Sequence, residues 1–581
     1  MKIELVAINA KYIHVNLAAY ALQSYAKQHG IYTEVKEYTI NHNADHILED
    51  VYISHPDVVA FSCYLWNITY VKELAYELKR LLPDLEIWLG GPEVSYDAEE
   101  VLHHHPEIRG IVIGEGEATF LEVCRHYQEQ KDLNEVAGIA YRTPEGDICF
   151  TGKRPCLDMD DLPFPYEDLS TMQNRILYYE SSRGCPFSCS YCLSSVDRNV
   201  RFKSLPKVYE ELQRFLDAKV PQVKFVDRTY NVQVEHALGI WNYIRQHDNG
   251  VTNFHFEVAA DILTPEEVEC LSQLRPGLVQ LEIGVQSTNG KTIEEIHRVM
   301  KVATVEEVTK RLKRCGNINL HLDLIAGLPY EDYRTFQKSF DDLFRMRPHQ
   351  LQLGFLKVLK GSYMYENAGE YGLLYHERPP YEVLCTKWLS FEEVIALKAV
   401  EEMVEVYYNS SQFSTVLGVC FYLRKENLGA EEAYGFFDGL ARYYRENGLF
   451  GIQHSRSRRY EILLSYLTED ERALGQKADA QQSKQIREAV LFDLYLRENL
   501  KSRPAWAGAI SEEEHKNRKE YGSRRHVERF SYDFTGLSFY RCEQAPVQKT
   551  CEVLFDYERR DPVTGNVAVE RMNHDQKGTN A

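Results

Sequence analysis

Short apolar runs alternate with amphipathic segments along the first 137 residues. Such runs predict strands that helices cover on both faces of a parallel sheet. A helical pattern over Leu17–His29 follows the first run. Five repeats of this unit predict a flavodoxin-like, doubly wound α/β domain, with its ligand beyond the carboxyl ends of the strands. The expected strands are Lys2–Ile8, Tyr32–Tyr38, Val58–Cys63, Glu86–Leu89 and Ile111–Ile113.

The same strand–helix unit repeats six times in the middle of the chain. A small hairpin over 138–150 and a linker containing Pro163 and Pro165 precede it. Successive βα units predict parallel strands joined by right-handed crossovers, and six of them give an open, partial barrel. The expected strands are Ile176–Glu180, Val223–Val226, Phe254–Val258, Leu278–Gly284, Asn319–Ile325 and Gln350–Leu356.

The remaining residues predict a mostly helical α+β region. The segment from Trp388 to about Asn447 and the segment Gln485–Asn499 have helical patterns, and Asp561–Gly565 is a turn between two strands of a hairpin. We expect residues after Met572 to be disordered. The predicted organisation is a first domain over 1–137, hairpin and linker over 138–170, a barrel over 171–368, an accessory domain over 369–571 and a tail over 572–581.

Composition narrows the class of protein. The 581 residues are 44% hydrophobic and 27% charged, as in a soluble globular protein. No apolar run reaches the length of a membrane span, and the N-terminus lacks a secretory signal, so we expect a cytoplasmic location. The net charge of −20 argues against a nucleic-acid partner, and the basic runs at 516–519 and 524–526 are interpreted as solvated faces.

Three cysteines carry the strongest chemical signal. Cys185, Cys189 and Cys192 are spaced as C-x₃-C-x₂-C, with Tyr191 before the last. Three thiolates at this spacing suit a 4Fe–4S cluster that keeps one iron open to a further ligand. A zinc site and a set of buried structural cysteines are the alternatives. Zinc would require a fourth protein ligand, and the Ser, Gly, Pro and Arg residues around the cysteines are typical of a loop rather than a core.

Other candidate residues follow the predicted strands. At the carboxyl ends of the barrel strands, where active groups gather, stand Asp227, Arg228, Glu257, Gln286, Ser287, Asp323 and Lys357. In the first domain two glycine loops occupy the equivalent places, and glycine lets a backbone approach a ligand closely. These loops are Gly90-Gly91-Pro92 and Gly114-Glu115-Gly116.

The cysteine motif, with its aromatic residue, resembles that of the radical SAM superfamily. The resemblance implies a (β/α)₆ barrel and S-adenosylmethionine (SAM) bound to the open iron and cleaved reductively to a deoxyadenosyl radical. It implies SAM contacts from the ends of the barrel strands. The implied SAM-binding residues are Tyr191, Asp227, Glu257, Gln286, Ser287 and Gly327. The family's Gly-Gly-Glu segment is replaced here by Phe225-Val226-Asp227-Arg228.

The two glycine loops of the first domain resemble those of the cobalamin-binding domain that precedes many radical SAM domains. The resemblance implies bound cobalamin, with contacts from Asn9, Asn16, Gly90, Gly91, Pro92, Gly114, Glu115 and Gly116. The D-x-H-x-x-G motif of cobalamin mutases is absent, because Tyr12 and Leu17 stand where Asp and Gly are needed. We therefore interpret His14 as a packing residue rather than a cobalt ligand.

Together the resemblances predict a cobalamin-dependent radical SAM enzyme that functionalises an unactivated carbon of an unidentified small molecule. Methylation is the expected outcome, with radical cyclisation or rearrangement as an alternative and a non-catalytic corrinoid or cluster sensor or carrier as another. An external one-electron reductant of flavodoxin or ferredoxin type is expected as a partner. The C-terminal region resembles an uncharacterised domain attached to such proteins, which implies no activity.

Overall fold

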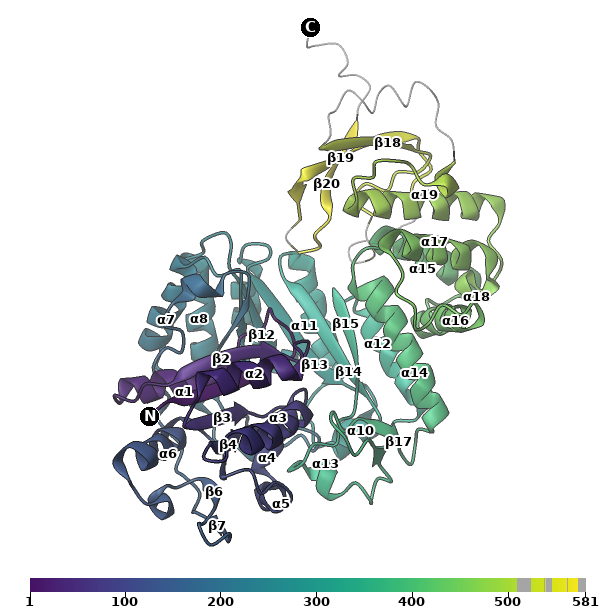
Figure 1. Ribbon diagram of the computed structural model, residues 1–581. Helices are drawn as coiled ribbons and strands as arrows, with labels where there is room; N and C mark the ends of the chain where they lie inside the picture. The colour runs from purple at the N-terminus through teal and green to yellow at the C-terminus, as the bar shows by residue number, and fades with distance from the viewer. Residues whose placement is uncertain (509–523, 538, 540–545, 562, 573–581) are drawn as a thin grey trace. The chain divides into compact units, whose positions relative to one another are not determined.

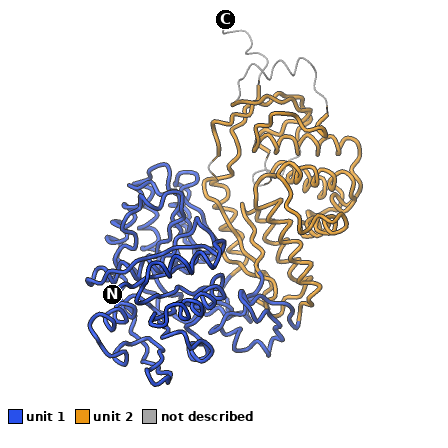
Figure 2. The backbone as a smooth tube through the Cα atoms, viewed as in Figure 1, with its two compact units in different colours: residues 1–282, 293–300, 355–387 blue, residues 283–292, 301–354, 388–581 orange. Residues whose placement is uncertain are grey.

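The computed structural model describes residues 1–508, 524–537, 539, 546–561 and 563–572 (Figure 1). Contacts divide the chain into two compact units (Figure 2). Unit 1 contains residues 1–282, 293–300 and 355–387, and unit 2 contains residues 283–292, 301–354 and 388–581. The basic run at 516–519 and residues 573–581 of the expected tail lie outside the described residues.

The first sheet has seven strands in the order β2-β1-β3-β4-β5-β6-β7. Its first five strands are parallel, as predicted, and end where the candidate loops begin. Their bounds are β1 Ile3–Asn9, β2 Glu34–Thr39, β3 Val58–Ser62, β4 Glu86–Gly90 and β5 Gly110–Val112. The hairpin expected over 138–150 forms β6 (Ile139–Arg142) and β7 (Ile148–Phe150), which extend the sheet because β6 pairs antiparallel with β5.

Helices cover both faces of this sheet, which confirms the doubly wound fold. On one face Ile47, Val51, Val71 and Leu74 pack with Phe61 and Ile87. On the other face Ala19, Tyr25, Phe120 and Leu121 pack with Leu5 and Trp88. The helices are α1 Leu17–Gln28, α2 Ala44–Ser54, α3 Ile68–Leu81, α4 Pro92–Ser95, α5 Ala98–His104 and α6 Glu117–Glu129.

The second sheet has six strands in the order β15-β14-β13-β12-β11-β8, and the boundary between the two units falls within β13. The order follows the sequence, and β8 and β15 stand at its ends, so in the described chain the sheet is an open, partial barrel as predicted. The strands are β8 Ile176–Tyr179, β11 Gln222–Phe225, β12 Asn253–Val258, β13 Val279–Gln286, β14 Asn319–Ala326 and β15 Gln350–Phe355. The helices are α7 Leu205–Asp217, α8 Val234–Gln246, α9 Pro265–Ser272, α10 Gly290–Glu295, α11 Val302–Cys315 and α12 Tyr333–Arg345.

The C-terminal region is mainly helical, as expected, and ends in a small antiparallel sheet. The helical pattern from Trp388 is divided into three helices, because a π-helical turn at Glu405–Asn409 ends the first and Gly429 in the left-handed conformation ends the second. The elements are α14 Phe391–Val404, α15 Ser414–Leu428, α16 Ala433–Glu446, α17 Arg456–Glu469, α18 Glu471–Leu474, α19 Ala480–Arg497, β18 Arg525–Phe530, β19 Cys551–Arg560 and β20 Val567–Met572.

This region packs on the last helix of the barrel within unit 2. Asp341 of α12 accepts a hydrogen bond from Tyr434 N at the start of α16 (2.8 Å). Arg347, just after α12, forms an ion pair with Glu431 (2.5 Å). The accessory region is therefore joined to the barrel by specific polar contacts as well as by the chain.

Candidate active site

The three cysteines lie in a loop between two short paired strands, β9 (Ser182–Arg183) and β10 (Arg201–Phe202). Gly184 begins the loop with a φ of 103°, and a Cβ there would lie 2.5 Å from Asn199 O. Cys185 N donates to Asp197 O (3.0 Å), and Cys192 N donates to Cys189 O (3.1 Å). These backbone contacts hold the loop closed around the thiols.

The thiols fit a cluster better than a single metal ion. Cys185 and Cys189 are buried, Cys192 is half-buried, and none of the three forms a disulfide. Among the described residues, the one group of three or more metal-binding side chains whose ligand atoms all lie within 4.8 Å is Glu115, Cys156 and Asp197. Sulfur ligands of one zinc ion lie roughly 4 Å apart. The loop thiols are spread more widely, as ligands at different corners of a cluster are.

Arg298 is a site residue that sequence reasoning missed. Its Nη1 lies 3.7 Å from Cys189 Sγ and 3.2 Å from the Tyr191 hydroxyl. A guanidinium beside a thiol stabilises the thiolate that binds iron. It opposes the burial that raises the pKa of the Cys189 thiol. Arg298 is more than a hundred residues away in sequence, so no local motif points to it.

Asp227 connects the end of β11 to the segment before the cysteine loop. Its carboxylate accepts hydrogen bonds from Ser181 N (3.0 Å), Ser181 Oγ (2.6 Å) and Ser182 Oγ (2.6 Å). Burial raises its pKa to about 6. With these three donors Asp227 has a structural role, because it fixes the segment before the cysteine loop. Its expected contact with SAM stays a prediction. Glu257 lies 3.8 Å from Lys224 Nζ, and its SAM contact also stays a prediction.

The predicted SAM residues of unit 2 follow β13 and β14. Gln286 adopts a left-handed conformation, with φ at 72°, and its buried Oε1 has no hydrogen-bond partner in the described chain. An unpaired buried amide oxygen suits a ligand that donates a hydrogen bond. Ser287 instead donates to Glu331 Oε1 (2.7 Å). Gly327 follows β14 with a φ of 92°, a conformation that favours glycine.

The loop after β4 requires its second glycine. Gly91 has a φ of 110°, and a Cβ there would lie 2.5 Å from Cys63 O. Gly90 precedes it, and Pro92 opens α4. Gly114, after β5, has a φ of 79° and open space around it, whereas Gly116 faces Leu22. Glu115 forms ion pairs with Arg183 and Arg201.

A stacked aromatic pair at the end of β3 was not expected from the sequence. The rings of Tyr64 and Trp66 lie 4.5 Å apart and 5° from parallel. Trp66 donates to Ile8 O (2.9 Å) and remains 43% exposed. This flat apolar surface stands at the same sheet edge as the glycine loops. The strand-end edge therefore fits a large planar group such as a corrinoid.

Asn9 and Asn16 have structural partners at this edge. Asn9 Nδ2 donates to Glu37 Oε1 (2.8 Å), and Asn16 Oδ1 caps α1 by accepting from Ala19 N (3.0 Å). His14 Nδ1 lies 2.8 Å from the Tyr178 hydroxyl. Burial lowers the pKa of His14. These contacts support the interpretation of His14 as a packing residue, and cobalamin contacts from the two asparagines stay predictions.

Comparisons with known families identify the two domains. Residues 3–124 match the B12 binding domain, and residues 179–343 match the radical SAM superfamily. The chain is a radical SAM enzyme with a B12-binding domain. Its cofactors are a 4Fe–4S cluster, SAM and cobalamin. Residues 369–553 match a family described as a protein of unknown function (DUF4080).

Individual relatives agree with this assignment. The chain is 25% identical over 515 residues to the cobalamin-dependent radical SAM methyltransferase TokK of Streptomyces tokunonensis, covering 79% of this chain and 72% of that protein. It is 25% identical to the anaerobic magnesium-protoporphyrin IX monomethyl ester cyclase of Rubrivivax gelatinosus, covering 55% and 60%. The fold is similar to that of the cobalamin-dependent SAM radical enzyme OxsB with aqua-cobalamin and SAM bound. That similarity has a TM-score of 0.58 at 15% identity and covers 84% of this chain and 78% of that one.

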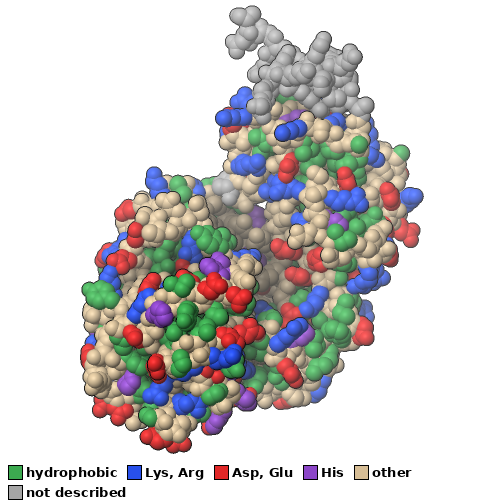
Figure 3. Space-filling view, viewed as in Figure 1, with side chains coloured by type: hydrophobic (Ala, Val, Ile, Leu, Met, Phe, Trp, Pro, Cys, Tyr) green, Lys and Arg blue, Asp and Glu red, His purple; other side chains and the backbone are tan. Residues whose placement is uncertain are grey.

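The surface charges and the character of the helices bear on possible partners. On the face shown in Figure 3, the side chains coloured by charge are of both signs and interspersed. Arg524, from the basic run at 524–526, pairs with Glu558 at 2.6 Å. Within the described residues, no helix has the length and apolar character that crossing a membrane requires.

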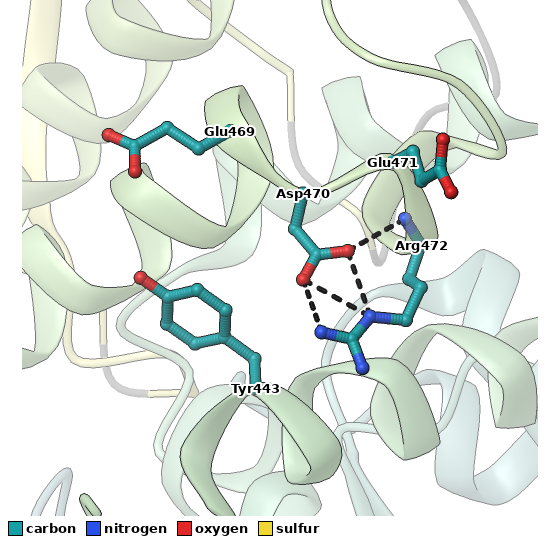
Figure 4. Close-up of a pocket in the computed structure, with 5 residues that line it drawn as sticks. All are labelled: Tyr443, Glu469, Asp470, Glu471 and Arg472. Atoms are coloured by element: carbon teal, nitrogen blue, oxygen red, sulfur yellow. Dashed lines mark hydrogen bonds and ion pairs between the residues drawn. The ribbon is translucent and has the colours of Figure 1, made fainter. Parts of the chain in front are cut away.

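The C-terminal region contains a separate pocket of about 440 Å³ (Figure 4). It is lined by Tyr443, Glu469, Asp470, Glu471 and Arg472. Arg472 binds Asp470 and Glu446, at 2.6 Å each, so its guanidinium is already neutralised. None of the predicted site residues lines this pocket.

Proposed function

We propose that this protein is a cobalamin-dependent radical SAM methyltransferase that modifies an unactivated carbon of a small molecule. The observation that carries the proposal is that the segment after β5 of the B12-binding domain pairs with β9, the strand that leads into the cysteine loop, within one compact unit. Arg183, two residues before Cys185, forms ion pairs with Glu115 (3.3 Å) and Glu117 (2.8 Å). Methyltransferases among the relatives support the assignment.

When bound, the three cofactors supply the radical and methyl-transfer chemistry. The chain's own residues supply position and environment. Cys185, Cys189 and Cys192 would hold the cluster, with Arg298 beside Cys189. Gly91, Gly114 and the Tyr64–Trp66 pair would accommodate the corrinoid, and Gln286 Oε1 would accept a hydrogen bond from SAM.

Radical cyclisation is the second candidate, because anaerobic magnesium-protoporphyrin IX monomethyl ester cyclases also occur among the relatives. A sensor or carrier without turnover is the third. We further propose that the protein works in the cytoplasm, with an external flavodoxin or ferredoxin as reductant. The domain limits proposed from the sequence remain 1–137, 138–170, 171–368 and 369–571.

The test uses the full chain, reconstituted without oxygen. We expect about four irons and four sulfides per chain and formation of deoxyadenosine from SAM under reductant. The triple variant Cys185→Ala, Cys189→Ala, Cys192→Ala should lose both, whereas Cys315→Ala, on the exposed end of α11, should keep both. Stoichiometric zinc without iron would contradict the cluster.

Methyl-labelled SAM then separates the candidates. With cell extract as the source of substrate, a methyltransferase transfers the label to a product other than SAM and its breakdown products. Deoxyadenosine without label transfer favours cyclisation or rearrangement. Absence of both, in protein that holds iron and cobalamin, favours a carrier or sensor.

A further inference from the structure

Residues 355–387 belong to unit 1 and have no assigned role. This bridging segment contains α13 (Tyr363–Glu366), β16 (Leu374–Tyr375) and β17 (Val383–Cys385). It contacts α4 (Pro92–Ser95) and the residue Asp97 after it through two polar pairs. Tyr381 Oη donates to Glu93 Oε2 (2.8 Å), with both residues buried, and Lys360 Nζ pairs with Asp97. The helix that directly follows the Gly90-Gly91 turn is therefore held by the bridging segment.

A close steric contact lies between these pairs. Gly361 has a φ of 82°, and a Cβ there would lie 2.3 Å from the ring of Tyr96. A side chain at this position would displace the tyrosine ring or the backbone of the bridging segment. The contact thus depends on glycine at position 361.

The same segment also holds the cysteine loop. Met364 N donates to Ser190 O (3.0 Å), and Ser190 lies between Cys189 and Cys192. Ser190 N donates to Ile296 O (3.0 Å), and the neighbouring Glu295 accepts from the Tyr371 hydroxyl of the bridging segment (2.8 Å). Ser190 is thus held on both sides: the bridging segment makes the first contact directly and binds the residue next to Ile296 in the second.

The spacing between the two loops follows from chain length. Lys360 and Met364 are four residues apart, so at most about 14 Å of extended chain separates their Cα atoms. Lys360 contacts Asp97, just after α4, and Met364 contacts the cysteine loop.

We propose that Lys360, Gly361 and Tyr381 are positioning residues that set the spacing between bound cobalamin and the cluster. The inference rests on the proposed function, since it assumes that both cofactors occupy the loops described above. It assigns the bridging segment a role that neither domain carries alone. Radical and methyl chemistry at one substrate requires the two reacting centres to be held in register, and small displacements are costly in such reactions.

The test measures spacing directly in the full chain loaded with cobalamin and cluster. Pulsed electron paramagnetic resonance reports the dipolar coupling between cob(II)alamin and the reduced cluster. We expect a narrow distance distribution in the wild type. The double variant Lys360→Met, Tyr381→Phe should broaden or shift it at unchanged iron and cobalamin content. Glu366→Gln, exposed at the end of α13, is the matched control and should leave it unchanged.

A charge exchange provides the second arm. Lys360→Asp combined with Asp97→Lys should restore the narrow distribution that Lys360→Asp alone loses. If Lys360→Asp loses cobalamin, the exchange variant decides the matter. Recovery of both the cobalamin content and the distance distribution supports the inference, and failure to recover either of them overturns it. A wild-type distribution in the loaded double variant also overturns it. A wild type that binds no iron or no cobalamin refutes the proposed function itself, and the inference with it.

Discussion

Arg183 Nη2 lies 2.8 Å from Glu117 Oε1, and this ion pair joins the B12-binding domain to the start of the cysteine loop. Glu117 is 5% exposed and sits at the start of α6. Arg183 also pairs with Glu180 at 2.7 Å. One guanidinium therefore neutralises carboxylates from both domains, two residues from the first cysteine of the cluster motif.

Replacing Arg183 by methionine should destabilise unit 1 by about 3 to 5 kcal/mol, because the buried carboxylate of Glu117 loses its cation. The free energy of unfolding in urea measures this effect. Arg80→Met is the control. Arg80 pairs with Glu77 on the exposed surface of α3, and its loss should cost less than about 1 kcal/mol. If the two substitutions lower the free energy of unfolding equally, the ion pairs of Arg183 stabilise the protein no more than an exposed ion pair does.

Gly91→Ala should be more harmful than Gly114→Ala. The first substitution combines an unfavourable φ with a Cβ 2.5 Å from backbone Cys63 O, whereas nothing lies within 4 Å of a Cβ at position 114. We expect a loss of about 1 to 2 kcal/mol for Gly114→Ala, and a larger loss together with weaker hydroxocobalamin binding for Gly91→Ala. Titration with hydroxocobalamin and urea unfolding measure both effects. Similar hydroxocobalamin affinities for the two variants would show that Gly91 does not contribute to cobalamin binding.

The apolar periodicity of the sequence predicted both sheets because parallel strands covered on both faces are apolar along their length. The cysteine spacing pointed to the cluster because its three ligands are local in sequence. Arg183, Arg298 and the bridging segment were not predicted. Their partners lie 66, 109 and up to 288 residues away, and an isolated Arg, Lys or Tyr carries no sign of its partner.

The hairpin at 138–150 and the serine partners of Asp227 show the same limit. The sequence predicts a hairpin over 138–150, but only tertiary packing decides that β6 continues the sheet beside β5. The position of Asp227 at a strand end suggested a ligand contact. Its side chain also accepts hydrogen bonds from Ser181 and Ser182, which the sequence did not predict, because a buried carboxylate requires nearby donors.

Asn409 caps the edge strand of the barrel, and Asn409→Ala should expose that edge. Its side-chain amide accepts from Leu351 N (2.8 Å) and donates to Leu351 O (3.0 Å), as a neighbouring strand would. Losing both partners should cost about 2 kcal/mol in unfolding free energy and promote association through β15. Light scattering and urea unfolding test this. Asn447→Ala, at the exposed end of α16, should change neither measurement.

Glu331 should make the stability of unit 2 depend on pH. Its carboxyl group is fully buried and accepts from Ser287 and Ser339 at 2.7 Å each, and burial raises its pKa from 4.5 to about 7. The folded protein therefore favours the neutral acid. The stabilising contribution of the proton is complete below pH 4.5 and is lost as the pH rises toward 7.

The difference between the two pKa values of Glu331 corresponds to a change of roughly 3 kcal/mol in the free energy of unfolding. Glu331→Gln keeps an acceptor for both serines and carries no titrating group. Its unfolding free energy relative to the wild type should therefore rise by about that amount between pH 4.5 and pH 8. Urea unfolding of cofactor-free protein across this range measures the difference. Glu73→Gln, on the exposed side of α3, is the control and should show no such trend. If the difference in unfolding free energy between Glu331→Gln and the wild type is constant with pH, Glu331 is ionised in the folded protein over the whole of this pH range.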